Sequence, residues 1–200
     1  MSSKPSYILF ITDQQRFDHL GCYNHPVLRT PNIDKIASEG VTFDRFYVSS
    51  PVCMPNRASL MTCRMPSSHG VRSLGIPLAH ENVTFVEMLR AAGYDTALIG
   101  KSHIQNVTDW PAQFESREYR VGYSVPPSDL KQAIRADLDN STYHYEQQRF
   151  WDQLNPKVKT PFYGFDHYDS VLRHGANSGG DFELWLKKKC TRDVRFTWSS

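Results

Sequence analysis

The stretch TFVEMLRAAGYDTALIGK, residues 84–101, decides the fold class of this chain. Thr84, with Glu87 three residues later, forms the capping-box pattern that opens a helix, and Gly93 is a typical helix stop. A short apolar strand from Tyr94 to Ile99 follows. A helix, a glycine stop and then a buried strand is the order of elements in an α/β fold with a mostly parallel sheet.

Three segments nearer the N-terminus extend this pattern. Residues 7–11, YILFI, are a continuous apolar run of the kind that forms a strand buried on both faces. A short helix is predicted from Pro31 to Glu39, stopped by Gly40. Residues 41–48 alternate and carry aromatic and β-branched side chains, which predicts a second strand. We therefore expect a doubly wound α/β fold with helices on both faces of a mostly parallel sheet.

The sequence signal weakens after about residue 106. Residues 109–161 are polar and aromatic, so we expect loops and an insertion there, with one helix near Tyr143 to Leu154. A further helix is predicted from Asp181 to Lys189, whose terminal lysines we interpret as a solvated face. The expected organisation is core blocks over residues 6–105, a loop and insertion region over 106–180 and a helix near 181–189.

Composition and charge argue against several classes of protein. The formal net charge of +2 does not indicate a nucleic-acid partner. No apolar segment approaches the length that spans a membrane, and the first residues lack the layout of a signal peptide, so we expect a cytoplasmic protein. The four cysteines have no disulfide-framework spacing and fit a reducing compartment; they are Cys22, Cys53, Cys63 and Cys190.

The pentapeptide CMPNR, residues 53–57, is the strongest candidate for chemistry. Pro55 suits the first turn of a helix, where a backbone N–H would have no partner. Cys53 would then lie at the positive end of the helix dipole, where exposed N–H groups attract anions. Arg57, about one turn further on, could reach back over the same face. The segment therefore predicts a place to bind and attack a negatively charged group.

Two other groups of polar residues are predicted at the same edge of the sheet. In open α/β sheets, ligands bind beyond the carboxyl ends of the strands. Asp13 follows one predicted strand, and Lys101 with His103 follows another. A carboxylate suits a hard divalent metal, while lysine and arginine suit a tetrahedral oxyanion. Together with Cys53, these residues describe a site for a sulfate or phosphate ester.

These blocks resemble, in order and in spacing, the N-terminal part of a type I (formylglycine-dependent) sulfatase of the alkaline-phosphatase-like superfamily. The resemblance is dense from Tyr7 to about Gln105 and thin beyond, so residues 1–200 are interpreted as the N-terminal portion of a sulfatase catalytic domain. The matching blocks are ITDQQ (11–15), TPNID (30–34), SPVCMPNRAS (50–59), Pro66 with HGV (69–71), AGY (92–94), GKSH (100–103) and GFD (164–166).

The resemblance implies a sulfuric ester hydrolase in which Cys53 is oxidised to formylglycine by a formylglycine-generating enzyme. In such enzymes one hydroxyl of the hydrated aldehyde attacks the sulfur of the ester and expels the alcohol, and the other then loses its proton as sulfate leaves. Arg57 would steady the hydrate. Lys101 would stabilise charge on the transferring group, and His103 would hydrogen-bond the nucleophile or the substrate.

The resemblance also implies a divalent metal ion, Ca²⁺ or alternatively Mn²⁺, held by Asp13, Gln14 and the modified Cys53. The implied partners are a small sulfate ester and the formylglycine-generating enzyme, with no nucleic acid and no membrane. Gln14 stands where many sulfatases have a second aspartate, which resembles the branch containing phosphonate monoester hydrolases. Hydrolysis of a phosphonate or phosphate ester on the same site is therefore an alternative.

Chain length leaves a further alternative open. Family members run well beyond 200 residues, and their second pair of metal ligands normally lies downstream. Asp166-His167 and Asp169 could be offered as substitutes, but we place the GFD block on the periphery. A truncated, catalytically incomplete chain that binds metal poorly is thus the other alternative.

Several residues also have structural interpretations. His103 could be a core histidine, and His69 is expected to satisfy a loop hydrogen bond. Cys22 and Cys63 are interpreted as buried small hydrophobes, although Cys63 also stands where a glycine is common downstream of the modified cysteine. A zinc site made of these two cysteines with His25 and His69 fits no paired ligand spacing.

Overall fold

The computed structural model describes residues 4–107, 143–153, 156–173 and 178–189. The chain divides into two compact units, Met1–Tyr47 and Val48–Ser200, and each is described by itself. The predicted segment 109–142 and Cys190 lie outside the described residues. Among the helices that are described, none is both long and apolar enough to cross a membrane.

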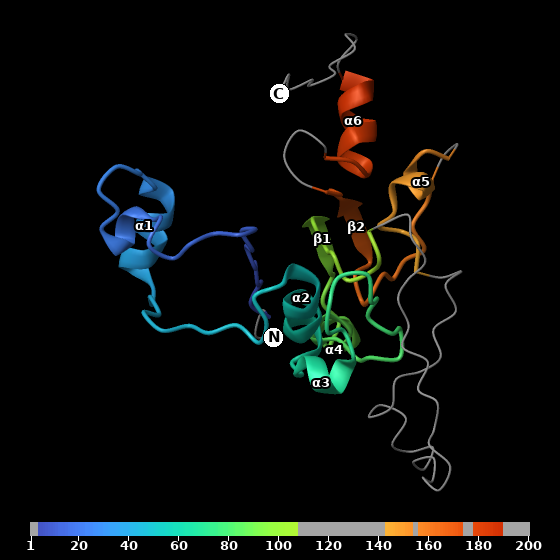
Figure 1. Ribbon diagram of the computed structural model, residues 1–200, viewed down its shortest axis with the longest axis horizontal. Helices are drawn as coiled ribbons and strands as arrows, with labels where there is room; N and C mark the ends of the chain where they lie inside the picture. Colours follow the sequence, from blue (N-terminus) through green and yellow to red (C-terminus); the bar gives the residue numbers. More distant parts are fainter. Residues whose placement is uncertain (1–3, 108–142, 154–155, 174–177, 190–200) are drawn as a thin grey trace, which may run out of the picture. The chain divides into compact units, whose positions relative to one another are not determined.

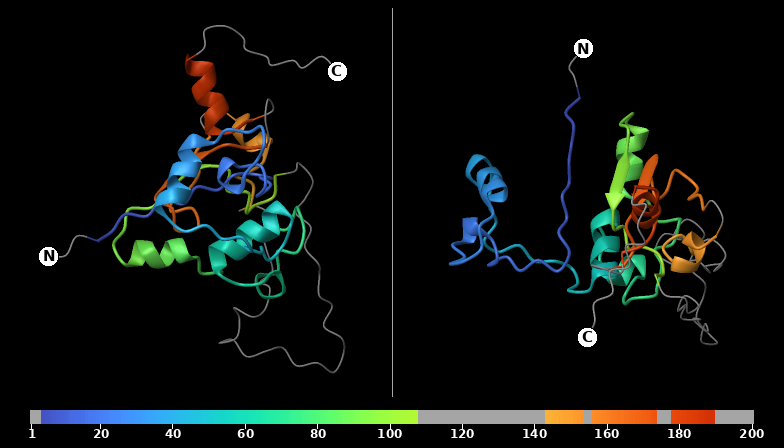
Figure 2. Two further views of the ribbon diagram at one scale, coloured as in Figure 1. Left: turned by 90° about the vertical axis from the view of Figure 1, so that its left-hand side faces the viewer. Right: turned by 90° about the horizontal axis from the view of Figure 1, so that it is seen from above.

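The first unit is built around the helix α1, Pro31–Glu39, which confirms the helix predicted there. The short 3₁₀ helix η1, Gly21–Tyr23, packs against α1 (Figures 1 and 2). Asp34 makes the connection, because its Oδ1 accepts hydrogen bonds from the Cys22 N–H at 2.7 Å and from the Thr30 hydroxyl at 2.8 Å. The TPNID block therefore has a structural function in this unit.

The two strands predicted at residues 7–11 and 41–48 are not strands in the structure, and this part of the prediction is wrong. Both segments are exposed along their length, with Phe10 83% and Tyr47 85% exposed. A strand is stable only where a neighbour takes up its backbone N–H and C=O groups. The apolar pattern of a segment indicates that its residues favour a strand, but it does not indicate whether a neighbouring strand is present.

The sheet of the second unit consists, within the described residues, of two parallel strands (Figures 1 and 2). Strand β1, Ala97–Gly100, pairs with β2, His167–Ser170, so that Leu98 lies beside Tyr168. β1 falls at the C-terminal end of the predicted strand and is shorter than expected. The parallel pairing agrees with the predicted fold class, of which this small sheet shows only part.

Helix α4, Phe85–Ala91, confirms the predicted capping box. The Thr84 hydroxyl accepts from the Glu87 N–H at 3.1 Å, and the Glu87 carboxylate accepts from the Thr84 N–H at 2.7 Å. Thr84 also donates its hydroxyl proton to the carbonyl oxygen of Tyr163 at 2.9 Å. The start of α4 is thereby joined to the loop that precedes β2.

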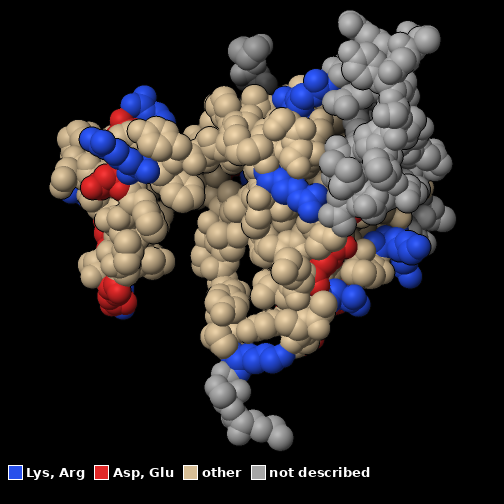
Figure 3. Space-filling view, turned by 90° about the horizontal axis from the view of Figure 1, so that it is seen from below, with Lys and Arg blue, Asp and Glu red and all other residues tan. Residues whose placement is uncertain are grey.

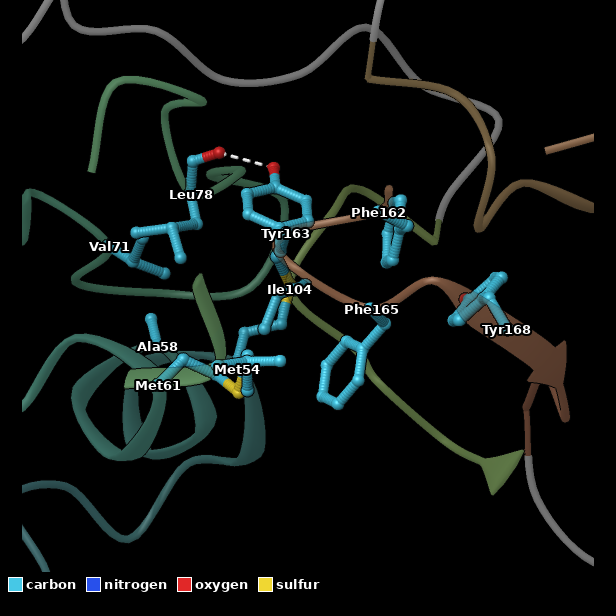
Figure 4. Close-up of a cluster of buried hydrophobic side chains, with 11 residues drawn as sticks. Met54, Ala58, Met61, Val71, Leu78, Ile104, Phe162, Tyr163, Phe165 and Tyr168 are labelled. Atoms are coloured by element: carbon cyan, nitrogen blue, oxygen red, sulfur yellow. Dashed lines mark hydrogen bonds between the residues drawn. The ribbon is translucent and has the colours of Figure 1, made fainter. Parts of the chain in front are cut away.

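The core of the second unit lies between α2, Cys53–Thr62, and this loop (Figure 4). Met54 and Ala58 of α2 are fully buried, and the Tyr163 hydroxyl donates to the carbonyl oxygen of Leu78. Gly164 and Phe165 of the GFD block are buried in this core, whereas Asp166 is exposed. Gly164 has φ +91°, and a Cβ there would lie 2.5 Å from the Glu87 nitrogen, which only glycine tolerates.

The second unit has three further helices among its described residues. Helix α3, Pro66–His69, is a single turn after α2, and α6, Asp181–Lys189, has the predicted bounds. The helix predicted near Tyr143 to Leu154 is the shorter α5, Gln148–Trp151, and Leu154 lies outside the described residues. Phe150 and Trp151 of α5 pack against Leu172 and form a small local core.

Charged side chains are interspersed with uncharged ones on the surface. On the face drawn in Figure 3, the lysines and arginines among the described residues form separate small groups between uncharged residues. The three lysines that end α6 are exposed, and Lys187 forms an ion pair with Glu183 at 2.7 Å. This agrees with their interpretation as a solvated helix face.

Candidate active site

Cys53 is the first residue of α2, as the sequence predicts. Val52, which precedes it, provides no side-chain cap. The first hydrogen bond of the helix is donated by the Asn56 N–H to the Val52 carbonyl oxygen at 3.0 Å, and Pro55 has no N–H. The N–H groups of Cys53 and Met54 therefore precede the hydrogen-bonded ladder, at the positive end of the helix dipole. Cys53 itself is half-buried.

Arg57 connects α2 to the segment that follows β1. Its side chain is only 9% exposed, and its Nη1 donates a 2.6 Å hydrogen bond to the carbonyl oxygen of Lys101. This bond fixes the side chain, and a guanidinium is a group whose fork of N–H donors matches a tetrahedral oxyanion. The structure thus brings the cysteine motif and the GKSH block together within one unit.

The GKSH block leaves the sheet through two residues with positive φ. Gly100, the last residue of β1, has φ +121°, and His103 has φ +51° and is 5% exposed. Left-handed backbone is unfavourable for a residue with a Cβ, by about 1–2 kcal/mol. His103 is thus as buried as a core histidine, but it lies on an irregular turn directly after the predicted catalytic lysine. Such local strain is typical of functional segments.

Glu146 is a buried acidic residue that the sequence did not single out. Its carboxylate accepts hydrogen bonds from the Ser102 hydroxyl, from the Ile104 N–H at 3.3 Å and from the Gln105 N–H at 2.7 Å. Burial raises the pKa of Glu146, while these hydrogen bonds favour the charged form. No local pattern could have identified it, because its partners lie more than 40 residues away in the chain.

His69 has the structural function predicted for it. Its Nδ1 accepts the Val71 N–H at 3.1 Å, so Nε2 carries the proton and donates to the Ser59 hydroxyl at 2.8 Å. Burial lowers the pKa of His69 from 6.5 to about 4, so the neutral ring persists to acidic pH. The ring thereby joins α3 to α2 behind the cysteine motif.

Two of the three predicted metal ligands, Asp13 and Gln14, belong to the first unit and are exposed, whereas the third, Cys53, belongs to the second unit. Gln14 has φ +54°, so it lies in a turn directly after the apolar run. Their oxygen atoms are of the type that Ca²⁺ and Mn²⁺ prefer, but Ca²⁺ takes about six to eight oxygen ligands. Over the described residues, no three or more His, Cys, Asp or Glu side chains are grouped to hold a metal ion. The oxygen atoms of Asp13 and Gln14 are therefore of a type that fits a hard cation, but two residues do not complete its shell.

The three other candidate metal ligands, Asp166, His167 and Asp169, take part in ion pairs at the surface. Asp166 forms an ion pair with Arg90 at 2.7 Å, which lowers its pKa, and His167 pairs with Asp169 at 2.9 Å. All four side chains are solvent-exposed.

The interpretation of Cys63 as a buried residue is wrong. Cys63 is exposed with φ +55° at the C-terminal end of α2, where a helix commonly takes a glycine in this left-handed conformation. Cys22 is half-buried, in the first unit.

Comparison with known proteins settles the family. The family model described as Sulfatase matches residues 5–159, more than half of the chain. This chain belongs to the sulfatase family. Human steryl-sulfatase is 38% identical over 116 residues, which cover 52% of this chain and 20% of that relative. Human arylsulfatase A is 40% identical over 108 residues, which cover 50% of this chain and 21% of the relative.

A bacterial sulfatase and a solved structure match over longer stretches. An ulvan-active sulfatase from Formosa agariphila is 32% identical over 157 residues, covering 78% of this chain and 28% of that protein. The crystal structure of Ps i-CgsB is 22% identical and covers 86% of this chain and 29% of that chain with a TM-score of 0.50, a likeness of fold. This sulfatase chain thus spans between about a fifth and a third of the length of these relatives.

Proposed function

We propose that this chain carries the nucleophile-bearing part of a sulfuric ester hydrolase, in which Cys53 is the precursor of formylglycine. Membership of the sulfatase family supports the reaction class. The observation that carries the proposal is the hydrogen bond from Arg57 Nη1 to the Lys101 carbonyl oxygen, because it joins the cysteine motif to the GKSH block. The proposed substrate is a small molecule that carries a sulfate ester.

The start of α2 suits the binding of a sulfate group. The N–H groups of the first helical turn are available to an anion bound at the start of α2, where the helix dipole favours negative charge. Arg57 is buried and held in place, so it stabilises that charge without having to reorganise. Lys101 and His103 follow β1 and supply further donors to the ester oxygens.

Formylglycine at residue 53, once hydrated, supplies one hydroxyl that attacks the sulfur of the ester and a second whose deprotonation releases the sulfate. Lys101 would stabilise the charge that develops on the transferring group, and His103 would hold a proton at the nucleophile or at the leaving alcohol. Asp13 and Gln14 would hold part of the shell of a divalent metal, which in enzymes of this class lowers the pKa of a bound hydroxyl.

One observation favours a second candidate function, hydrolysis of a phosphonate or phosphate ester. Gln14 contributes no negative charge to the metal ion, where a second aspartate would contribute one. Sulfate and phosphonate esters are both tetrahedral anions, so the same donors would accommodate either. A comparison of rates on the two esters is therefore part of the test.

The test uses the chain co-expressed with a formylglycine-generating enzyme. Mass spectrometry of the peptide that contains Cys53 should show an aldehyde in place of the thiol. Hydrolysis of an aryl sulfate should be lost in Cys53→Ala and retained in Cys63→Ala, the matched control at an exposed cysteine outside the motif. Hydrolysis that survives Cys53→Ala, or a thiol that stays unmodified, would contradict the proposal. An aldehyde without turnover would instead support the incomplete-chain alternative.

A further inference from the structure

The segment from Lys101 to Gln105 is held by hydrogen bonds at several points in the second unit. Arg57 Nη1 donates to the Lys101 carbonyl oxygen at 2.6 Å. The carbonyl oxygen of Ile104 accepts from the Leu78 N–H at 2.8 Å. These two bonds fix both ends of the turn on which His103 lies but make no contact with its middle.

The middle of the turn is held by Glu146. One carboxylate oxygen accepts from the Ser102 hydroxyl and from the Ile104 N–H at 3.3 Å, and the other accepts from the Gln105 N–H at 2.7 Å. The side chain is 1% exposed, so these bonds are made out of contact with solvent. A second hydrogen bond joins the same two segments, because Gln105 Oε1 accepts the Tyr145 N–H at 3.1 Å.

A carboxylate in this environment is expensive for the folded state. Taking a charged group out of water costs several kcal/mol. The hydrogen bonds to Glu146 compensate for this cost but give no net stabilisation beyond it. Burial correspondingly raises the pKa of Glu146. An apolar side chain would fill the same space at lower cost. The contribution of Glu146 is therefore to geometry, since it orders the backbone that donates to it.

The geometry in question is the left-handed backbone of His103, with φ +51°. A residue with a Cβ keeps this conformation only where its surroundings determine it. The Glu146 bonds fall on Ser102 just before His103 and on Ile104 just after it, so they fix the turn from both sides. The hydrogen bond from Arg57 fixes the backbone of Lys101, the residue before Ser102.

We propose that Glu146 is a positioning residue, which holds Lys101 and His103 in a preorganised arrangement beside the start of α2. It acts through the backbone of the GKSH block and does not touch the ester. The structural part of this inference stands on the hydrogen bonds alone, whereas its consequence for turnover rests on the proposed function.

Hydrogen exchange of the full 200-residue chain tests the structural part. In Glu146→Gln, which keeps the volume but replaces an acceptor by a donor, amide exchange of residues 102–105 should rise about tenfold or more, the factor that a loss of about 1.4 kcal/mol gives. Exchange of α4 should stay unchanged. Ser102→Ala should raise exchange at the same residues by a smaller factor, and Glu183→Gln, the control, should leave them unchanged. Unchanged exchange in Glu146→Gln, or an equal rise in α4, would overturn the proposal.

Kinetics test the consequence. With the modified chain and an aryl sulfate, Glu146→Gln should lower kcat by about tenfold or more and leave KM within about threefold, because preorganisation acts in the transition state. A rise in KM at constant kcat would overturn the positioning role. Absence of turnover in the unaltered, modified chain would support the incomplete-chain alternative. The exchange comparison, which needs no turnover, would then decide the positioning role of Glu146 by itself.

Discussion

The Nη1 of Arg57 lies 2.6 Å from the carbonyl oxygen of Lys101, although the two residues are 44 positions apart in the chain. Arg57 belongs to the first turns of α2, and Lys101 follows the end of β1. One hydrogen bond therefore sets the distance between the helix start that carries Cys53 and the block that carries His103. In a site that binds a small anion, such a fixed distance decides whether all donors can reach it together.

We predict that Arg57→Lys destabilises the second unit by about 1–3 kcal/mol, because a lysine is shorter and leaves the Lys101 carbonyl oxygen without its charged donor. Urea unfolding of the variant and of the unaltered chain measures this. The control is Arg45→Lys, a change at an exposed arginine of the first unit, which should lie within about 0.5 kcal/mol of the unaltered chain. Equal unfolding midpoints for both variants would contradict the structural function of Arg57.

Gly164→Ala should be much more damaging than Gly75→Ala. Both glycines have similar positive φ, +91° and +84°, so alanine is strained at either by about 1 kcal/mol. A Cβ at Gly164 would also lie 2.5 Å from the Glu87 nitrogen, whereas at Gly75 the nearest atom is 4.0 Å away. Overpacking against backbone adds about 1–3 kcal/mol at Gly164 alone. Thermal unfolding of the two variants side by side checks the difference, and equal losses would show that the close approach is not maintained in solution.

The parts of this structure that the sequence predicted are those with local signals. The capping box at Thr84, the proline in the first turn of α2 and the glycine after α1 are each readable within a few residues, and all three helices are present. The cysteine motif was found for the same reason, since its spacing is contained in five residues.

The parts that the sequence missed depend on residues far apart in the chain. The segment 7–11 has the composition of a buried strand, yet a strand also requires a partner, and composition carries no information about one. Glu146 has no signal of its own, because its function follows from hydrogen bonds to a turn about 40 residues earlier. Contacts between residues far apart in the chain leave no local pattern in the sequence.

The low pKa of His69 makes the second unit sensitive to acid. The unfolded histidine binds a proton at about pH 6.5, whereas the folded ring binds one only near its pKa of about 4. The unfolded state thus binds more protons between these values, so stability is complete above about pH 6.5 and is lost as the pH falls towards 4, by up to about 3 kcal/mol. Urea unfolding from pH 4.5 to pH 7.5 should show this slope.

The variant His69→Gln tests the assignment of that slope. It should be less stable than the unaltered chain at neutral pH, because the Ser59 and Val71 partners are lost, but its stability should vary less between pH 4.5 and 6.5. His167→Gln, at a histidine that is 63% exposed, should keep the full slope. If His69→Gln retained the slope of the unaltered chain, another group would have to carry it.

Thr84 should be more sensitive to loss of its hydroxyl than to loss of its methyl group. The hydroxyl accepts from the Glu87 N–H at 3.1 Å and donates to the Tyr163 carbonyl oxygen at 2.9 Å, so Thr84→Val removes the helix cap and leaves a buried acceptor unpaired. We expect a loss of about 2–3 kcal/mol for Thr84→Val and about 1 kcal/mol or less for Thr84→Ser, which keeps both bonds. Urea unfolding ranks the two variants. A valine variant as stable as the serine variant would mean that methyl packing, and not the hydrogen bonds, joins α4 to the loop before β2.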